Sequence, residues 1–554
     1  MHLHLRKALP LACLIVLSPP ASLPSSQTVA ADDDAQDTRR DLMRYARDTW
    51  RGFEALERPG GLPADSLTVA RDGSWTLAGY TSPTDVAAYL WSILAAESLH
   101  LIDADEAGKR LGRTLDALGH LDRSHGFFYN WYDAGSGARL ATWPVGGHAA
   151  RPFLSSVDNG WLAAAFIMVG NARPELRTRA EALLAPMDFG FFYDPFNPAD
   201  PDAHPGNLVL GYWTDDDTYT RYHYGLMNTE PRIATYVGIA RNQLPAEHYY
   251  RLKRTIPSRL GGREPAPEGE TRTYAGVPVF EGHTTYRGAR IVPSWGGSMF
   301  EALMVPLFVP EDRWAPDSWG LNHPLYARAQ VEYGLNEANY GFWGFSPSES
   351  PHGGYREYGV APLSTKPIGY PSGDLAGSGE PARGPSAPLH GVVTPHASFL
   401  ALPFLPNEAM LNLRTLERKF PAYGPFGFYD SVDVSTGMVA DGVLALDQGM
   451  ILAAIANHLA DDILRRHLCD GQIEQVIRPL IAQEQFTAAY PTSASSTSST
   501  SAEPPALAPA GGVTRDQAQA GLPAIASNRT AGRSRPRRAC RTGRQRVAEG
   551  PSLA

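Results

Sequence analysis

The chain has 554 residues, of which 43% are apolar and 19% are charged, a composition typical of a globular protein with a large core. Its formal net charge of −9 is unevenly distributed, because the part from Phe486 onward holds nine Arg against three acids. That segment therefore carries +6, and the remainder −15. An acidic body disfavours a nucleic-acid-binding surface and suits a neutral sugar or a cation.

The first 31 residues have the pattern of a secretory signal peptide. Arg6 and Lys7 precede an apolar run over residues 8–17, and small residues follow up to Ala31. We therefore expect a secreted protein, extracellular or periplasmic. Two cysteines remain after residue 31, too few for a disulfide framework or a thiolate metal site. No other apolar stretch is long enough for a membrane span.

Helical periodicity recurs along most of the chain and predicts twelve helices. Their expected ranges are 39–56, 82–102, 104–121, 155–171, 174–187, 229–241, 296–309, 324–337, 395–405, 407–420, 447–459 and 464–481. Nearly all-apolar helices tend to alternate with amphipathic ones. This alternation predicts an inner ring of helices inside an outer ring, an all-α (α/α)6 toroid.

One catalytic domain is expected over residues 32–485, despite its length. Residues 271–294 read as a β-hairpin inserted into it, because short β-branched runs are interrupted by glycine. Residues 486–554 are rich in Ser, Pro and Ala and then in Arg, which predicts a disordered tail.

A pattern of glycine, aromatics and an acid recurs before several predicted inner helices. "GFFYNWYDAGSG" begins at Gly126 and "GFYDSVDVSTG" at Gly427, with weaker echoes at Gly190 and Gly341. In a toroid, the loops that enter the inner helices gather at one mouth. Each copy could simply plug a loop against the core, but several copies with tryptophans nearby favour a sugar-binding cleft, because aromatic faces stack on sugar rings.

Two carboxylates suit glycoside hydrolysis, which needs a protonated acid and a second carboxyl group. Glu230 begins a buried helix and is the candidate acid, although the helix dipole alone would favour a glutamate there. Asp430, in "GFYD", is the candidate base, although it could be a turn residue.

Further residues are expected to contact the substrate. Asp158 and Asp447 could instead be helix caps, and Glu301, about two turns into its helix, would need a buried partner. The expected set is Trp131, Asp133, Asp158, Trp161, Trp213, Tyr224, Trp295, Glu301, Trp343, Glu349, Tyr429 and Asp447.

No cofactor or metal is expected. "TDDDTY" at 214–219 could bind calcium, but a solvated acidic loop is the simpler interpretation. His223, His352 and His396 are too scattered in sequence to indicate a metal site, and zinc-binding and phosphate-loop motifs are absent.

Nine ordered motifs from about Asp37 to Ala460 resemble the glycoamylase-like proteins. They are "GFFYNWYD", "SSVDNGWLAA", "NTEPRIATYVGIARNQLPAEHYYRLKR", "WGGSMFEALMVPLF", "YGFWGFSPSES", "YREYGVAPLSTK", "VVTPHASFLAL", "GFYDSVDVSTG" and "LALDQGMILAAIAN". That family includes bacterial β-1,2-glucanases and a region of cyclic β-1,2-glucan synthases. The resemblance implies an (α/α)6 toroid that hydrolyses β-1,2-linked glucan with inversion and without a metal.

The same resemblance implies that the acid is Glu230 in "NTEPRI" and the base Asp430 in "GFYD". The chain departs from the family at Phe153 and Leu154, where relatives often carry a glutamate, and at Thr229–Arg232, where the synthases read differently. These differences leave open the substrate and the choice between internal and terminal cleavage.

Two other functions compete with a β-glucanase. One is a glycosidase on another polysaccharide, an α-glucan or a cell-wall glycan. The other is a non-catalytic sugar-binding protein, which could lose acids that this chain retains; a polysaccharide lyase is disfavoured because the motifs are rich in acid rather than Arg. We expect a monomer whose partner is a poly- or oligosaccharide.

Overall fold

The computed structural model describes residues 26–144, 147–257, 262, 266–366 and 391–490. Most of the predicted signal peptide and most of the predicted tail lie outside the described residues. The first helix, α1 (Ser26–Leu56), begins before the predicted cleavage point at Ala31 and well before residue 39, where periodicity places it.

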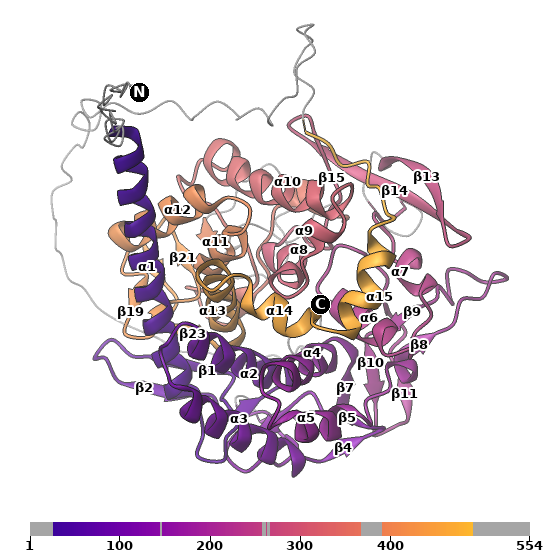
Figure 1. Cartoon of the computed structure of the whole chain (residues 1–554), viewed down its shortest axis with the longest axis horizontal. Helices are drawn as coiled ribbons and strands as arrows, with labels where there is room; N and C mark the ends of the chain where they lie inside the picture. The colour runs from indigo at the N-terminus through magenta and orange to yellow at the C-terminus, as the bar shows by residue number, and fades with distance from the viewer. Residues whose placement is uncertain (1–25, 145–146, 258–261, 263–265, 367–390, 491–554) are drawn as a thin grey trace, which may run out of the picture. The chain divides into compact units, whose positions relative to one another are not determined.

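Helices form the body of the molecule and pack side by side in a ring (Figure 1). Its inner helices, named here the inner ring, are α2 (Pro83–Ser98), α4 (Ser156–Ala172), α6 (Arg232–Ala240), α8 (Met299–Leu303), α11 (Pro395–Ala401) and α13 (Ala445–Leu459). Along this order α2 packs against α4, α4 against α6, α8 against α11 and α11 against α13, and α13 returns to α2. Between α6 and α8 the contact includes a hydrogen bond of 3.0 Å from Arg232 Nη2 to the carbonyl of Ala302.

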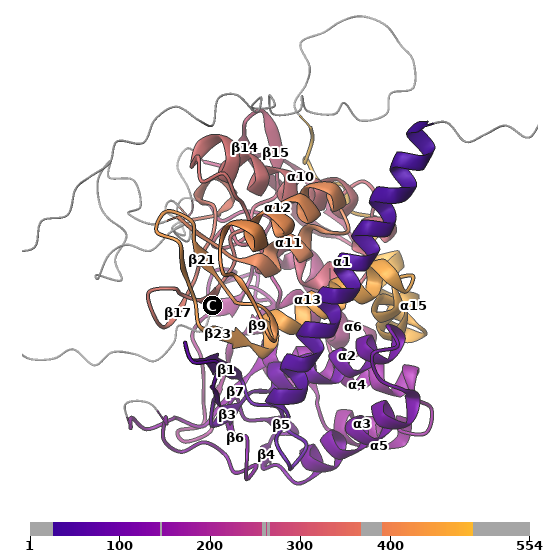
Figure 2. The ribbon, with the colours of Figure 1, turned by 90° about the vertical axis from the view of Figure 1, so that its left-hand side faces the viewer.

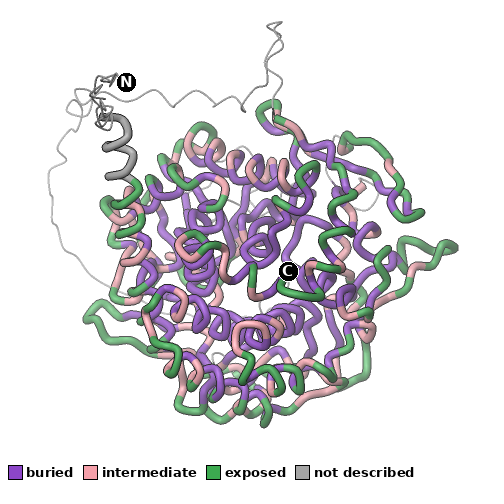
Figure 3. The backbone as a smooth tube through the Cα atoms, viewed as in Figure 1, coloured by how far each residue is buried: buried purple, intermediate pink, exposed green. Residues whose placement is uncertain are grey.

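A second set of helices covers the outside of the inner ring. In the order of the inner helices that they contact, they are α3 (Ala104–Gly119), α5 (Arg177–Leu184), α15 (Gln472–Ile481), α10 (Trp319–Glu332), α12 (Pro406–Lys419) and α1. Shorter helices α7 (Glu247–Arg251), α9 (Glu311–Trp314) and α14 (Ile463–Cys469) fill the gaps. The pattern of burial follows the sequence: α3 buries Leu111, Leu115 and Leu118 on one face, whereas α2 is buried nearly all round (Figure 3).

Two glycines permit close packing within the inner ring. A Cβ on Gly160 of α4 would lie 2.6 Å from the Cβ of Ala234 in α6, and one on Gly449 of α13 would lie 2.9 Å from the Cβ of Ala88 in α2. Such distances are well inside van der Waals contact, so these helices approach each other closely because no side chain intervenes.

The strands are short and most belong to the loops between helices. Their bounds are β1 (Ser66–Val69), β2 (Trp75–Leu77), β3 (Tyr80–Thr81), β4 (Arg123–Ser124), β5 (Phe127–Phe128), β6 (Tyr132–Asp133), β7 (Phe153–Ser155), β8 (Tyr193–Asp194), β9 (Asn207–Val209), β10 (Gly211–Trp213), β11 (Thr218–Tyr219), β12 (His223–Tyr224), β16 (Ser348–Glu349), β17 (Tyr355–Arg356), β18 (Val392–Val393), β19 (Tyr423–Gly424), β20 (Gly427–Phe428), β21 (Val432–Asp433), β22 (Met438–Val439) and β23 (Gly442–Leu444). Figure 2 shows β1, β3, β6, β7, β17 and β23 together on one side of the helices. Every strand pairing among the described residues is antiparallel, except for two isolated parallel bridges.

The predicted hairpin insertion is present as a three-stranded sheet of β13 (Glu268–Tyr274), β14 (Val277–Tyr286) and β15 (Ala289–Ile291). Tyr274 pairs with Val277, and both residues of the turn between them have positive φ, 48° at Ala275 and 80° at Gly276. This turn type matches the twist of the strands that it joins.

The predicted start of the tail at residue 486 is wrong by a few residues. Phe486 is buried and packs edge-on against Trp319, with ring centroids 5.0 Å apart. Thr487 Oγ1 donates to the carbonyl of Glu281 at 2.7 Å, and Ala489 forms a β-bridge with Arg290. Residues 486–490 therefore extend the body along the inserted sheet, because they bury an aromatic ring and satisfy its backbone groups.

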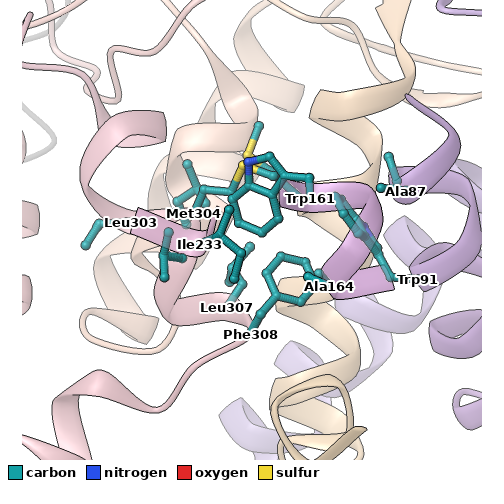
Figure 4. Close-up of a cluster of buried hydrophobic side chains, with 14 of the residues drawn as sticks. Ala87, Trp91, Trp161, Ala164, Ile233, Leu303, Met304, Leu307 and Phe308 are labelled. Atoms are coloured by element: carbon teal, nitrogen blue, oxygen red, sulfur yellow. The ribbon is translucent and has the colours of Figure 1, made fainter. Parts of the chain in front are cut away.

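Aromatic and aliphatic side chains pack together in a buried cluster between the inner helices (Figure 4). Trp91 of α2 lies with its ring centroid 4.7 Å from that of Phe308, and Trp161 of α4 lies 5.4 Å from the same ring. All three side chains are at most 1% exposed. The expectation that Trp161 contacts substrate is therefore wrong: its helix turns the indole into the core.

A buried ion pair joins α6 to α9 behind this core. Arg232 donates to both carboxylate oxygens of Glu311, at 2.7 and 2.9 Å, and neither side chain is exposed. Tyr236 and His323 make further hydrogen bonds to Glu311. Burial would raise the pKa of Glu311, but the charge of Arg232 and the hydrogen bonds from His323 and Arg232 outweigh it and lower the pKa to about 2.

Replacing Glu311 with Gln should destabilise the protein strongly, because Arg232 would remain charged in a site without solvent. We expect the free energy of unfolding to fall by about 3–5 kcal/mol, measured by urea denaturation. Glu270→Gln, which removes an exposed partner of Arg272, is the matched control and should cost less than about 1 kcal/mol. Equal effects of the two substitutions would contradict a stabilising role for the buried pair.

Candidate active site

Every helix of the inner ring carries a titratable side chain at or just before its first turn. These are Asp85 on α2, Asp158 on α4, Glu230 before α6, Glu301 on α8, His396 on α11 and Asp447 on α13. The loops that enter these helices add four more acids. We name the acids that interact with one another the acidic cluster: Asp65, Asp85, Asp158, Glu230, Glu301, Glu349, Glu357, Asp430 and Asp447.

Glu230 lies in the turn before α6 and is 5% exposed. Burial, and then the negative charge of Glu301, raise its pKa well above the usual value, and Asp158 adds to this effect. Arg232 opposes the shift only partly. These effects favour the protonated form of the Glu230 carboxyl group, the form that a general acid requires.

Asp430 follows β20 and is 2% exposed. The backbone N–H of Leu444 donates to both of its oxygens, at 3.1 and 3.2 Å. Burial, and then the charge of Asp447, raise the pKa of Asp430 well above its usual value, although the Leu444 hydrogen bond lowers it. Asp430 is thus a buried carboxyl group held by the backbone, and more than the turn residue that the sequence left as an alternative.

Glu349, on β16, lies beside Asp430. Burial, followed by the charges of Asp441 and Asp65, raises the pKa of Glu349 to about 7. The backbone of Gly442 leaves room for this carboxylate, since a Cβ at position 442 would lie 1.5 Å from Glu349 Oε2. With any other residue at position 442, the Glu349 carboxylate would have to move from this position.

Two acids of the cluster, Asp65 and Asp85, were missed from the sequence. Asp85 forms a capping box with Ser82 at the start of α2 and is also hydrogen-bonded to Asp65. Burial raises the pKa of Asp65 to about 6, and burial with the charge of Asp65 raises that of Asp85 well above its usual value. A hydrogen bond between two carboxyl groups needs one shared proton, which agrees with both shifts.

Glu357 and Tyr355 were also missed. Burial and the charge of Glu301 raise the pKa of Glu357 to about 7. Loss of hydration inside the protein raises the pKa of Tyr355 well above its usual value, and the charges of Asp447, Glu357 and Glu230 add to this effect. Its side chain is nevertheless 50% exposed. Tyr355 therefore lies within interaction range of Asp447, Glu357 and Glu230 while about half of its side chain faces solvent.

Asp158 is held at the start of α4. Thr84 Oγ1 donates to its Oδ1 at 2.5 Å. In the amide orientation that satisfies both neighbours, Asn130 donates to Asp158 Oδ2 at 3.0 Å and accepts from Trp131 Nε1 at 3.2 Å. Tyr224 interacts with both Glu230 and Asp158, so it lies beside the acidic cluster.

Three half-buried aromatic rings lie against the cluster. Trp131 is edge-on to Tyr80 and to Trp143, with ring centroids 5.4 and 5.2 Å apart, and Tyr80 is 5.7 Å from Trp143. The Tyr80 hydroxyl is hydrogen-bonded to Asp65. The sequence pointed to Trp131 alone, because Tyr80 and Trp143 lie outside the recurring glycine-aromatic-acid pattern.

Several predicted substrate contacts have other roles. Trp343 is 2% exposed and belongs to the core. Glu301 lies in the first turn of α8, not two turns in, and its carboxylate accepts from Ser294, Gly296 and Ser298. The Glu301 carboxylate thus takes part in the capping box with Ser298 at the start of α8. Asp133 accepts from Gly135 and Ser136 within its own turn.

The remaining predicted aromatics lie at the edge of the site or outside it. Trp213 packs against Phe153 and is covered by the guanidinium of Arg151, 4.2 Å from its centroid. Lys366 lies 4.0 Å above the ring of Trp295. Burial and the charge of Asp441 raise the pKa of Tyr429, which places it near Glu349.

Two further properties of the described residues bear on ligands. No group of three or more His, Cys, Asp or Glu among them is arranged to hold a metal ion. Nor does any helix within the described ranges combine the length and apolar character needed to cross a lipid bilayer.

Comparison with known proteins confirms the resemblance to glycoamylase-like proteins that the ordered motifs indicated. Residues 264–470 match the family model described as "Putative glucoamylase", and residues 44–190 match a family described as a protein of unknown function, DUF3131. The two matches together cover both the Glu349 and Asp430 region and the Asp158 region of the site.

One curated relative is the cyclic β-(1,2)-glucan synthase NdvB of Rhizobium meliloti (strain 1021). It is 24% identical over an alignment of 610 residues that covers 82% of this chain and 19% of the synthase. The chain thus spans about a fifth of the length of that relative.

Solved structures share the fold. The putative glucoamylase from Bacteroides caccae is 18% identical, with a TM-score of 0.56, covering 80% of this chain and 99% of its own. The endo-β-1,2-glucanase from Chitinophaga pinensis, solved with sophorotriose and glucose, is 15% identical with a TM-score of 0.57, covering 80% and 98%. An endo-β-1,2-glucanase from Talaromyces funiculosus is 12% identical with a TM-score of 0.57, covering 84% and 93%.

The raised pKa of Asp65 makes stability depend on pH. Its carboxyl group titrates at about 6 in the folded state and at 3.8 ordinarily, so the stability that it contributes below pH 4 is lost as the pH rises through 6. We therefore expect the effect of Asp65→Asn on the free energy of unfolding to be more favourable at pH 8 than at pH 4. The difference should be about 1–2 kcal/mol after allowance for partial exposure.

Chemical denaturation at the two pH values measures this difference. Glu181→Gln, on the exposed face of α5, is the control and should shift stability by less than about 0.5 kcal/mol at either pH. A loss of stability at pH 8 in Asp65→Asn would show that the ionised form of Asp65 is favourable in the fold.

Proposed function

We propose that the protein is a glycoside hydrolase that cleaves a β-glucan, with β-1,2-linked glucan as substrate. The observation that carries the proposal is the pair of buried carboxyl groups, Glu230 and Asp430, held at one end of the ring and linked through Tyr355 and Asp447. The resemblance to endo-β-1,2-glucanases and to the glucan synthase supports the substrate class.

In this proposal Glu230 is the general acid. Its protonated carboxyl group would transfer the proton needed by the departing sugar oxygen, and its burial favours this protonated form. Asp430 would be the general base that activates water on the opposite face of the sugar. This arrangement gives inversion at the anomeric carbon.

The remaining polar groups would orient the substrate. Tyr224, beside Glu230, and Glu349, beside Asp430, each present a polar group from a loop strand. The rings of Tyr80, Trp131 and Trp143 would stack on a glucosyl residue next to the acids, because sugar C–H groups pack on aromatic faces.

We also propose three features on which the comparisons are silent. The pairing of each inner helix with one outer helix supports a complete (α/α)6 toroid. Arg6 and Lys7 ahead of an apolar run support export by a signal peptide, hence an extracellular or periplasmic enzyme. The chain is proposed to act as a monomer.

Product analysis on a panel of glycans tests the function. The panel holds linear and cyclic β-1,2-glucan, laminarin, cellulose oligosaccharides, starch and an arabinan. We expect short oligosaccharides from β-1,2-glucan alone, with rates falling by about 10²–10⁴ or more in Glu230→Gln and in Asp430→Asn. Glu247→Gln, on the exposed face of α7, should keep the wild-type rate.

Other outcomes would change the conclusion in defined ways. Products from a different glycan, lost in the same variants, would keep the mechanism and replace the substrate. Binding to one glycan without any products would identify a sugar-binding protein.

The aromatic rings make a separate prediction. Trp143→Ala should raise KM for polymeric glucan about tenfold, equivalent to about 1.4 kcal/mol, with a smaller change in kcat, because it removes stacking and leaves the acids in place. Trp75→Ala, an exposed ring on β2 that packs against Phe426, is the matched control. An unchanged KM in Trp143→Ala would exclude this ring from the substrate site.

A further inference from the structure

The site contains two copies of one structural unit. The first copy comprises residues 82–84, 128–137 and 153–160, and the second comprises residues 394–396, 428–437 and 442–449. In each, a hairpin beginning Phe-Tyr is followed by an inner helix, α4 or α13, and the preceding inner helix, α2 or α11, begins with proline and packs against it.

Hydrogen bonds show that the copies are equivalent in space. Asn159 of α4 donates to the carbonyl of Phe128, and Gln448 of α13 donates to the carbonyl of Phe428. Asp133 closes its turn by accepting from Ser136, as Asp433 does from Thr436. The backbone frame is therefore the same, and differences between the copies reside in the side chains.

The copies share one acid and differ at the two positions around it. The shared acid is Asp158 in the first copy and Asp447 in the second. Next to it, Asn130 in the first copy corresponds to Asp430 in the second, since each follows Phe-Tyr in its hairpin. On the other side, Thr84 corresponds to His396, since each follows the first proline of its helix.

The contacts show what these differences do. In the first copy, Asp158 is flanked by two neutral groups, the Thr84 hydroxyl at 2.5 Å and the Asn130 amide at 3.0 Å. In the second, Asp447 Oδ2 lies 3.1 Å from His396 Nδ1, and both side chains are at most 4% exposed. The second copy thus adds one carboxyl group and one imidazole together.

This pairing resolves a difficulty in the proposed mechanism. A general base must be ionised, yet burial and the charge of Asp447 oppose the ionisation of Asp430. With both carboxyl groups ionised, Asp430 and Asp447 together carry a charge of −2. An imidazolium at His396 beside Asp447 would bring the total charge of this trio, Asp430, Asp447 and His396, to −1. In the first copy no such compensation is needed, because Asn130 carries no charge.

We propose that His396 is a positioning residue that offsets the charge of Asp447 and thereby lets Asp430 lose its proton and act as the base. The inference rests on the proposed function for its catalytic meaning, but the charge compensation itself is independent of it. His396 does not touch the substrate in this scheme; it acts through Asp447.

The titratable groups that surround this trio come from several elements. Asp447 and Asp430 face Asp65 from the loop before β1, and Asp430 also faces Glu349 from β16. Tyr355, from β17, faces Asp447. Among the described groups that interact with Asp430 or Asp447, His396 is the one basic side chain for which a contact is resolved.

The first test is the pH–rate profile of His396→Thr, which places the residue of the first copy in the second. We expect the acidic limb of kcat to move upward by about one pH unit, so that activity below the limb falls about tenfold while activity above it is largely retained. His396→Gln, which keeps a hydrogen bond without a charge, should behave like His396→Thr. An equal loss at every pH, or a wild-type profile in His396→Gln, would overturn the proposal.

The second test needs no activity and compares melting temperatures at pH 7. His396→Thr should lower the melting temperature, because two neighbouring carboxyl groups then lack a basic partner. Adding Asp430→Asn should restore it, since the double variant carries the neutral groups of the first copy. Asn130→Asp, which adds a carboxyl group where no histidine is present, should reproduce the loss.

The two tests separate two kinds of failure. If no glycan is hydrolysed, the proposed function fails, and the melting temperatures still decide whether His396 compensates Asp430. If Asp430→Asn does not restore the stability of His396→Thr, the compensation is absent, whatever the protein hydrolyses.

Discussion

The convergence of the inner helix starts on one acidic cluster is the constraint on which the rest of the structure depends. Buried carboxyl groups are unfavourable when ionised, and several within interaction range are more so. The N-terminal ends of α2, α4, α8 and α13 point free N–H groups and partial positive charge at them, which offsets part of that cost. The ring geometry thus makes possible a concentration of acids that a single loop could not hold.

Beneath the cluster, the molecule is built to keep these helix starts fixed. Trp91, Trp161 and Phe308 fill the axis of the ring, and the Arg232–Glu311 pair ties the helix that follows Glu230 to α9. A rigid floor matters because the proton transfers proposed for the site require fixed distances between carboxyl groups. Polar function is confined to one end of the ring and apolar packing to its middle.

Part of this was predictable from the sequence. Alternating helix character and recurring motifs predicted the ring and brought Glu230, Asp158, Asp430 and Asp447 into one site. Asp65, Asp85 and His396 were not predicted, because a loop acid, a capping acid and an isolated histidine have ordinary local explanations. The sequence predicted the same role for every tryptophan near a motif, but the structure places them differently. Trp131 lies at the site, whereas Trp161 and Trp343 lie in the core. Only packing decides which way a ring faces.

The two close-packed glycines of the inner ring have a consequence for the site as a whole. Gly160 and Gly449 lie one turn or less below Asp158 and Asp447, at the seams where α4 meets α6 and α13 meets α2. The absence of a side chain at each seam sets the circumference of the ring at the level of the acids. The distance across the ring near Asp158 and Asp447 is therefore set in part by these two positions, and a single methyl group at either one would push two inner helices apart.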